Sequence, residues 1–245
     1  MMDALSFKAR PVILAGGLGT RLRQVVSDKP KVLAEVNGRP FLDYVLDQID
    51  RAGIRSAILC IGYLGNQIIE RYGNRYKNVQ LVYSSEDVQL GTGGAVANAV
   101  PFIDSDYVIV MNGDSYCAFD MNELMCFHIN KNSNITMLVK HVADSARYGL
   151  VNISKDKSIT CFIEKNGLPI PGQINAGVYV MNSSVVKAIP KNVNISLERD
   201  ILPLYVNNRL FAYQSEEDFI DIGIPSDYEK AYEFEFRLCD KRGRS

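Results

Sequence analysis

The stretch Val12-Ile-Leu-Ala-Gly-Gly-Leu-Gly-Thr-Arg-Leu-Arg23 passes from an apolar run directly into glycines and arginines. The apolar residues 11–15 are typical of a buried strand. Ligands of an open parallel sheet bind beyond the carboxyl ends of its strands, which is where residues 16–19 would lie. Glycines there let backbone N–H groups approach an anion, and a helix beginning near Thr20 would add the positive end of its dipole. The stretch therefore predicts an anion site at the end of the first strand.

Two familiar glycine motifs do not fit this stretch. The dinucleotide-binding pattern Gly-x-Gly-x-x-Gly needs a glycine where Leu22 stands, and no Gly-Lys-Ser/Thr follows for a P-loop. Between Arg10 and Lys31 there are five basic residues and one acidic residue, in a chain of net charge −1. Such a local excess of positive charge fits several phosphates better than one carboxylate. A tight turn that merely needs glycine stays open as the alternative for the glycines alone.

The rest of the first half alternates apolar runs with helical patterns, which indicates βαβ units. The strands are apolar on both faces, as in a parallel sheet covered by helices on both sides. The fold class predicted is α/β, with a doubly wound, mostly parallel, Rossmann-like sheet. The expected strands are 11–15, 56–61, 79–83 and 107–111, and the expected helices are 41–52, 64–72 and 94–99.

From about residue 134 the texture changes to alternating strands, which predicts a smaller lobe with a mixed sheet. We therefore expect one domain over residues 1–245, with a nucleotide-binding lobe at about 11–133 and a second lobe at about 134–236. Residues 237–245 are polar and basic and are expected to form a flexible tail. The strands expected in the second lobe are 135–141, 150–153, 159–163 and 176–181.

Composition excludes several classes of protein. A net charge of −1 argues against a general nucleic-acid binder or a membrane-surface protein. No run is long enough to span a membrane, and residues 1–10 lack the apolar core of a signal peptide, so a cytoplasmic location is expected. The five cysteines show no Cys-x-x-Cys pairing, and Cys60 and Cys161 lie in apolar runs. Buried, reduced thiols are therefore predicted in place of disulfides or zinc.

The glycine-rich stretch also carries a family resemblance. Gly16-Gly-Leu-Gly-Thr-Arg-Leu22, followed by Lys29-Pro-Lys31, resembles the start of the sugar-1-phosphate nucleotidylyltransferases. The resemblance implies a GT-A-like nucleotidyltransferase fold, with a nucleoside triphosphate and a sugar 1-phosphate as substrates. It continues through Leu90-Gly-Thr-Gly-Gly-Ala95, Asn112-Gly-Asp114, Glu164-Lys165, Asn175-Ala-Gly177 and Asp221-Ile-Gly-Ile-Pro225.

The resemblance implies a role for each matching residue. Arg21 would hold the pyrophosphate leaving group, Lys31 would neutralise charge near the α-phosphate, and Lys165 would bind the sugar phosphate. Asp114 and Asp221 would hold the catalytic Mg²⁺. The nucleotide site would comprise Leu14, Ala15, Gly16, Gly17, Gly19, Thr20, Arg21, Lys31, Gly91, Thr92 and Asp114, with Gly91 and Thr92 against the base. The sugar site would comprise Gly149, Glu164, Lys165 and Asn175.

The residues also support a metal site without the resemblance. Asp114 follows an apolar strand and so lies at a carboxyl end, and Asp221 follows a short apolar run and precedes Gly223. Two carboxylates suit Mg²⁺, which takes water and phosphate oxygens for its other ligands. The alternatives are that Asp114 is a cap or turn residue and that Asp221 caps a helix beginning near Pro225.

Two further alternatives concern other motifs. Lys165 could be no more than an exposed strand end. The glycines of residues 91–94 could simply open a helix that packs closely on a neighbouring segment.

The expected chemistry is in-line attack of a sugar 1-phosphate oxygen on the α-phosphorus, with positioning and charge neutralisation as the task of the protein. No side-chain nucleophile is required, so His128 and His141 are expected to be bystanders.

Residues 90–95 and 219–228 most resemble the branch that uses GTP and D-glycero-α-D-manno-heptose 1-phosphate. Enzymes that use UTP or another triphosphate with N-acetylmuramate, glucose or mannose 1-phosphate stay open as alternatives, as does a catalytically silent regulatory protein. The oligomeric state is also open, with a homodimer as one possibility.

Overall fold

Four parallel strands form the centre of the main sheet. The computed structural model describes residues 8–22, 25–163, 167 and 169–237. In the sheet, β1 lies between β4 and β7, and β6 continues the order beyond β4. The predicted doubly wound, mostly parallel architecture is confirmed. These strands are β1 (Ala9–Leu14), β4 (Ser56–Ile61), β6 (Val79–Ser85) and β7 (Tyr107–Asn112).

The order of these strands creates a switch point beside β1. The chain runs from β1 outward to β4 and β6, and then crosses back to place β7 on the other side of β1. Connections on the two sides of β1 therefore leave in opposite directions, which opens a crevice at the carboxyl ends of β1 and β7. Residues 15–19 follow β1, and Gly113 and Asp114 follow β7, so both segments lie at this crevice.

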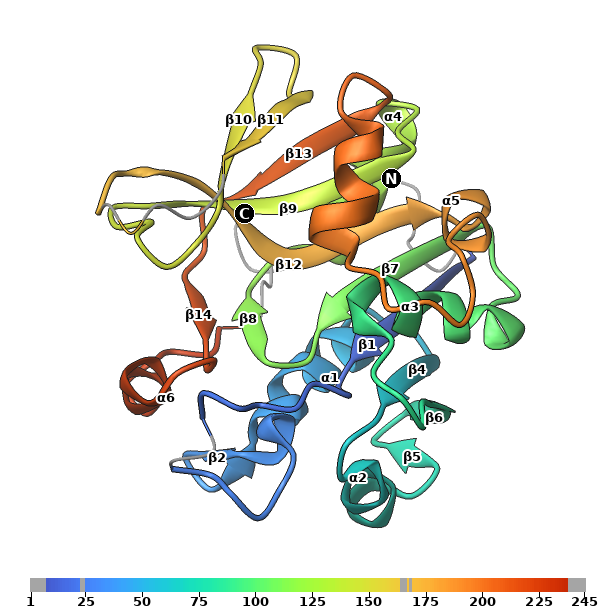
Figure 1. Ribbon diagram of the computed structural model, residues 1–245, viewed down its shortest axis with the longest axis vertical. Helices are drawn as coiled ribbons and strands as arrows, with labels where there is room; N and C mark the ends of the chain where they lie inside the picture. Colours follow the sequence, from blue (N-terminus) through green and yellow to red (C-terminus); the bar gives the residue numbers. More distant parts are fainter. Residues whose placement is uncertain (1–7, 23–24, 164–166, 168, 238–245) are drawn as a thin grey trace, which may run out of the picture.

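The second half of the chain extends the same sheet (Figure 1). β12 pairs antiparallel with β7 and also with β9, and β13 adds to the far side of β9. One ten-stranded sheet therefore carries both halves of the chain, and β11 lies at its edge beyond β10. The bounds are β5 (Arg75–Tyr76), β9 (Ile135–Val142), β10 (Leu150–Ile153), β11 (Ile159–Ile163), β12 (Gly172–Asn182) and β13 (Leu210–Ser215).

Two short ribbons lie outside the main sheet. β8 (Ser115–Cys117) pairs antiparallel with β14 (Phe219–Asp221), with Asp221 opposite Ser115. β2 (Glu35–Val36) pairs with β3 (Arg39–Pro40) just before the first helix. The β8–β14 ribbon brings residues 219–221 to the end of β7 (Figure 1).

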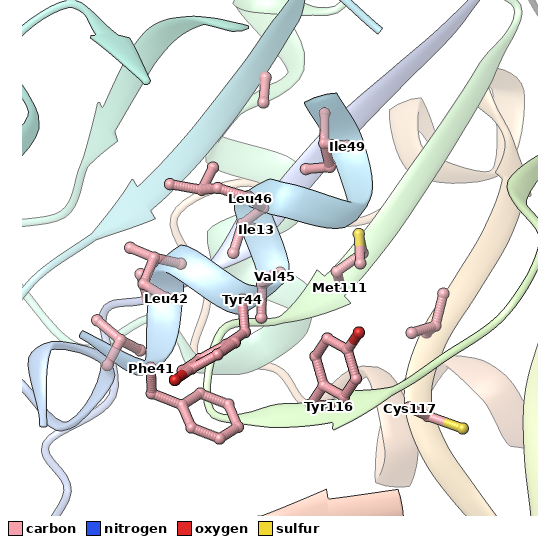
Figure 2. Close-up of a cluster of buried hydrophobic side chains, with 14 of the residues drawn as sticks. Ile13, Phe41, Leu42, Tyr44, Val45, Leu46, Ile49, Met111, Tyr116 and Cys117 are labelled. Atoms are coloured by element: carbon pink, nitrogen blue, oxygen red, sulfur yellow. The ribbon is translucent and has the colours of Figure 1, made fainter. Parts of the chain in front are cut away.

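The helices cover both faces of the sheet because its strands are apolar on both sides. Ile13 of β1 packs into the hydrophobic cluster that includes α1, α2, α4 and α6, while the adjacent Val12 packs into the cluster that includes α3 and α5. Figure 2 shows Phe41, Leu42 and Val45 of α1 in the first cluster. The α-helices are α1 (Phe41–Arg51), α2 (Gly65–Tyr72), α3 (Gly91–Asn98), α4 (Met121–Asn130), α5 (Ser183–Lys187) and α6 (Pro225–Ala231). A π-helical turn spans Leu197–Ile201, and 3₁₀ turns span Lys31–Leu33, Val100–Phe102 and Leu202–Tyr205.

Two sequence-based expectations are wrong. No regular helix begins at Thr20: residues 20–22 form turns, in which the Leu22 N–H donates to the Gly19 carbonyl at 2.9 Å. Cys161 is exposed, because β11 is the edge strand and has a neighbour on one side only. Cys60 is buried as expected, and the cysteines of the described residues are free thiols. Within the described ranges, no helix has the length and apolar character needed to cross a bilayer.

We expect Phe41→Ala to lower the free energy of unfolding by about 3–5 kcal/mol, because it leaves a cavity beneath α1. The Phe41 side chain is fully buried, in contact with Tyr44 and Phe236. The measurement is urea unfolding followed by circular dichroism. Phe102→Ala is the matched control, because Phe102 is 43% exposed and should lose less than about 1 kcal/mol. Equal losses in both variants would contradict the packing described for α1.

Candidate active site

A cavity of about 280 Å³ lies at the switch point. Every residue expected in the nucleotide site lines it, so the structure brings together segments far apart in the sequence. These lining residues are Leu14, Ala15, Gly16, Gly17, Gly19, Thr20, Arg21, Lys31, Gly91, Thr92 and Asp114. Their roles toward a ligand stay predictions.

Six further residues line the cavity that sequence reasoning did not select. They are Val32, Glu86, Gln89, Ala95, Asn112 and Gly223. The rule that found Asp114 could also have found Glu86, because Glu86 directly follows the carboxyl end of β6. Ala95, Asn112 and Gly223 lie inside motifs already identified, whereas Val32 is apolar and lies outside them.

The glycine-rich loop lines the cavity and lies close to Lys31. Gly19 has a φ of +60°, and a Cβ at this position would lie 3.1 Å from the Cβ of Lys31. A larger residue at 19 would therefore be strained and would displace Lys31. Because residues 20–22 form turns, the positive potential that the described part of the loop offers an anion comes from its N–H groups together with Arg21 and Lys31.

Asp114 lines the cavity, whereas Asp221 does not line it and lies opposite Ser115, the residue that follows Asp114. Lys31 Nζ donates to Asp114 Oδ2 at 2.6 Å, and the Ile222 N–H donates to the Asp114 carbonyl at 3.0 Å. Burial, together with the negative charge of Asp114, raises the pKa of Asp221, while Lys31 and Arg147 act in the opposite direction. Two carboxylates held together in this way form a site that favours a cation.

The alternatives for these two aspartates can now be decided. α6 has no side-chain cap, and Asp221 Oδ1 instead accepts the Gly223 N–H at 2.6 Å. Asp114 lies in a turn, and its carboxylate pairs with Lys31. The cap of the nearby α4 is Asp120. The capping interpretation is therefore wrong for both residues, whereas the turn alternative for Asp114 is confirmed.

The donor set fits Mg²⁺. The described residues contain no cluster of three or more His, Cys, Asp or Glu side chains that could enclose a metal. Two carboxylates beside an open, phosphate-sized cavity leave the remaining positions to phosphate oxygens and water, which is how Mg²⁺ is commonly held.

Of the residues expected at the sugar site, the two that the structure describes, Gly149 and Asn175, do not line this cavity. Asn175 Oδ1 accepts the Gly177 N–H at 2.9 Å, where β12 bulges against β9. Gly177 has a φ of +76°, and a Cβ there would lie 2.7 Å from Nδ2 of the cavity residue Asn112. The bulge therefore brings Asn175 close to the end of β7. Glu164 and Lys165 lie outside the described residues.

Gly149 is linked to the carboxylate pair through its neighbours. Arg147 forms an ion pair with Asp227 of α6, and its Nη2 lies 4.0 Å from Asp221 Oδ1. The ring of Tyr148 packs edge-on against Phe219 of β14 at a centroid distance of 5.6 Å. The segment that leads into β10 is thus tied to the same ribbon that carries Asp221.

The glycines of α3 pack closely on a neighbouring segment. A Cβ at Gly91 would lie 2.6 Å from the Ile195 carbonyl oxygen, and one at Gly94 would lie 2.5 Å from that of Val193. The close-packing interpretation is therefore confirmed for these glycines. Gly91 and Thr92 line the cavity as well, so base contact by these two residues stays a prediction.

Glu86 places a carboxylate in the cavity wall. Its Oε1 lies 3.4 Å from the position that a Cβ on Gly16 would take, and its Oε2 accepts the Leu90 N–H at 3.3 Å. Burial raises the pKa of Glu86. The two histidines lie elsewhere: His128 is buried against Thr136 and Asn182, and His141 is an exposed residue of β9.

Comparison with known proteins identifies relatives over most of the chain. The family model described as nucleotidyl transferase matches residues 10–236. The chain is 37% identical to D-glycero-α-D-manno-heptose 1-phosphate guanylyltransferase of Aneurinibacillus thermoaerophilus, across 90% of this chain and 95% of that protein. It is 32% identical to mannose-1-phosphate guanylyltransferase of Mycobacterium tuberculosis, across 89% of this chain and 62% of that protein. The crystal structure of HddC from Yersinia pseudotuberculosis complexed with GMP-PN has a TM-score of 0.82 and 35% identity, and the match covers 91% of this chain and 98% of that one.

We expect Asp221→Asn to increase the free energy of unfolding at neutral pH. The raised pKa of Asp221 means that its charged form is less stable in the folded protein than in the unfolded chain. The gain should disappear as the pH falls through that raised pKa, because the wild-type carboxyl is then protonated. The measurement is denaturant unfolding across a pH series without divalent cations.

Asp114→Asn is the matched variant, with a smaller gain or a loss expected. It removes the carboxylate that Lys31 contacts at 2.6 Å, which costs about 1–2 kcal/mol, but it also removes the charge that opposes ionisation of Asp221. Destabilisation of both variants to the same degree would contradict the unequal electrostatics of the two carboxylates.

Proposed function

Because this chain belongs to the nucleotidyl transferase family, we propose that it joins GTP and D-glycero-α-D-manno-heptose 1-phosphate into a GDP-heptose, with release of pyrophosphate. The relatives named above are sugar-1-phosphate guanylyltransferases, so the chain is an enzyme of the sugar-1-phosphate nucleotidylyltransferase class. The choice of heptose follows the 37% identity that spans nearly the whole of both chains. Mannose 1-phosphate is the second candidate, favoured by the 32% identity to the mycobacterial enzyme.

The observation that supports guanine is the Glu86 carboxylate in the cavity wall. Guanine presents its N1–H and its N2 amino group side by side, and a carboxylate accepts two such donors at once. Uracil presents one N–H between two carbonyl oxygens, and at least one of these would face the carboxylate and repel it. Glu86 therefore both attracts guanine and rejects uracil, which is how specific sites commonly discriminate.

The mechanism follows from the positions of the charged groups. Arg21 and Lys31 lie on the cavity wall with the glycine loop, where they would hold the triphosphate and offset the charge that develops on the leaving pyrophosphate. Asp114 and Asp221 would hold Mg²⁺, which when bound supplies positive charge at the phosphate oxygens. Lys31 would exchange part of its contact with Asp114 for a phosphate oxygen. A phosphate monoester is already an adequate nucleophile, so the protein has to align it and exclude competing water.

We expect pyrophosphate release when the protein is mixed with Mg²⁺, GTP and D-glycero-α-D-manno-heptose 1-phosphate. The test crosses GTP, ATP, CTP and UTP with the 1-phosphates of heptose, mannose, glucose and N-acetylglucosamine in a coupled pyrophosphate assay. EDTA should abolish the release. A preference for UTP, or for glucose 1-phosphate, would overturn the proposed substrates. A protein that gains thermal stability with GTP yet releases nothing from any pair would instead be a silent binding protein.

Glu86→Gln should reduce the preference for GTP over UTP, measured as the ratio of kcat/KM values, by about 10- to 100-fold. The amide can pair with either base, so the variant loses both the charge-assisted bonds to guanine and the repulsion of uracil. Asp87→Asn is the matched control, because it removes an equal charge from an exposed residue that does not line the cavity. A Glu86→Gln ratio equal to that of the control would remove Glu86 from base selection.

A further inference from the structure

A continuous chain of hydrogen bonds joins the nucleotide cavity to Asn175. Thr92, which lines the cavity, donates through Oγ1 to Glu198 Oε2 at 2.8 Å. Tyr179 donates through its hydroxyl to the other oxygen, Glu198 Oε1, at 3.1 Å. Asn175 Nδ2 in turn donates to the Tyr179 hydroxyl at 2.5 Å. One carboxylate therefore connects α3, β12 and the turn Leu197–Ile201.

Glu198 fixes which group donates and which accepts in each of these hydrogen bonds. An ionised carboxylate only accepts hydrogen bonds, so Thr92 and Tyr179 must both donate to it. The Tyr179 oxygen is then left to accept from Asn175, and the Thr92 oxygen accepts the Leu197 N–H at 2.8 Å. Ser196 also donates its hydroxyl to Glu198, at 2.9 Å.

Burial keeps this direction stable. The Tyr179 side chain is fully buried, and burial together with the charge of Glu198 raises its pKa far above the usual value. The phenol therefore stays protonated and keeps donating at any working pH. The backbone holds the ends in register, because the Gly93 N–H donates to the Ile195 carbonyl at 2.9 Å.

This series of hydrogen bonds gives the side-chain amide of Asn175 a single orientation. Its Nδ2 has one N–H engaged by Tyr179, and its Oδ1 has one lone pair engaged by Gly177. An amide has two N–H groups and two acceptor positions, so one donor and one acceptor are left for a ligand. A pair of neighbouring sugar hydroxyls, one accepting and one donating, matches this arrangement.

We propose that Glu198 and Tyr179 are positioning residues that orient Asn175 toward the hydroxyls of the sugar phosphate and link that orientation to Thr92 in the nucleotide cavity. The inference rests on the proposed function, because it takes Asn175 as a sugar contact. It adds two residues that touch neither substrate. It also explains why a carboxylate stands at 198, where an amide could not accept from all three hydroxyl groups.

The first test is Tyr179→Phe, which removes the hydroxyl that links Glu198 to Asn175 and leaves the hydrogen bond between Glu198 and Thr92 intact. The expected result is a rise of about tenfold in KM for the sugar phosphate, with KM for the triphosphate within twofold of wild type. Tyr44→Phe is the matched control, because it removes another buried hydroxyl, which donates to the Val36 carbonyl at 2.9 Å away from the cavity. The control should keep both KM values even where its melting temperature falls as far.

The second variant is Glu198→Gln, which affects the hydrogen bonds from both Thr92 and Tyr179. Its amide nitrogen can only donate, so either Thr92 or Tyr179 loses its acceptor, and KM should rise for both substrates by severalfold or more. This variant also decides the matter if Tyr179→Phe does not fold. A KM for sugar phosphate within twofold of wild type in the folded variants would overturn the inference.

The wild-type reaction separates this inference from the proposed function. Each variant is assayed with the triphosphate and sugar phosphate that the wild type uses best. If the wild type releases no pyrophosphate from any pair, the proposed function fails and the inference falls with it. If the wild type is active and the folded variants match it, the inference alone fails.

Discussion

The pairing of β8 with β14 is the interaction on which the site depends. Asp114 comes from the first half of the chain and Asp221 from its end, and only this short antiparallel ribbon places them together. The arrangement is electrostatically unfavourable by itself, since burial and the neighbouring carboxylate both oppose the charge on Asp221. The ion pair between Lys31 and Asp114 offsets part of this repulsion. Stability is thus given up locally to hold two carboxylates together, as is common where function requires close like charges.

Sequence patterns predicted the parts of the fold that local chemistry determines. The strands Ser56–Ile61, Leu150–Ile153 and Ile159–Ile163 match their expected bounds, because apolar runs between turn residues have few other conformations. The predicted start of a helix at Thr20 was wrong, because residues 20–22 form turns. The prediction that Cys161 is buried was wrong. The order of strands in the sheet makes β11 an edge strand, and this order cannot be inferred from the sequence of one strand.

The candidate site was predictable where a motif stands at a strand end and unpredictable where contacts are purely tertiary. The strand-end rule and the family resemblance found the glycine loop and Asp114, and the same rule applies to Glu86. Glu198 carries no such signal, because its partner Thr92 lies 106 residues away and its own segment matches no motif. Only the folded chain shows that this one carboxylate accepts hydrogen bonds from both Thr92 and Tyr179.

The pairing of β7 with β12 limits how the two lobes can move relative to one another. Because a single hydrogen-bonded lattice spans both lobes, a hinge between them would have to break the sheet, so adjustments to a ligand must come from loops. The β10–β11 hairpin joins that sheet at its margin: Leu150 pairs with Ile174 of β12, and the turn before β11 bridges to β13, where Ser158 lies opposite Phe211. Substitutions or insertions in this outer hairpin can therefore be accommodated without disturbing the central strands. The margin of the sheet can in this way diverge among descendants of one gene while the strands that carry the cavity stay the same.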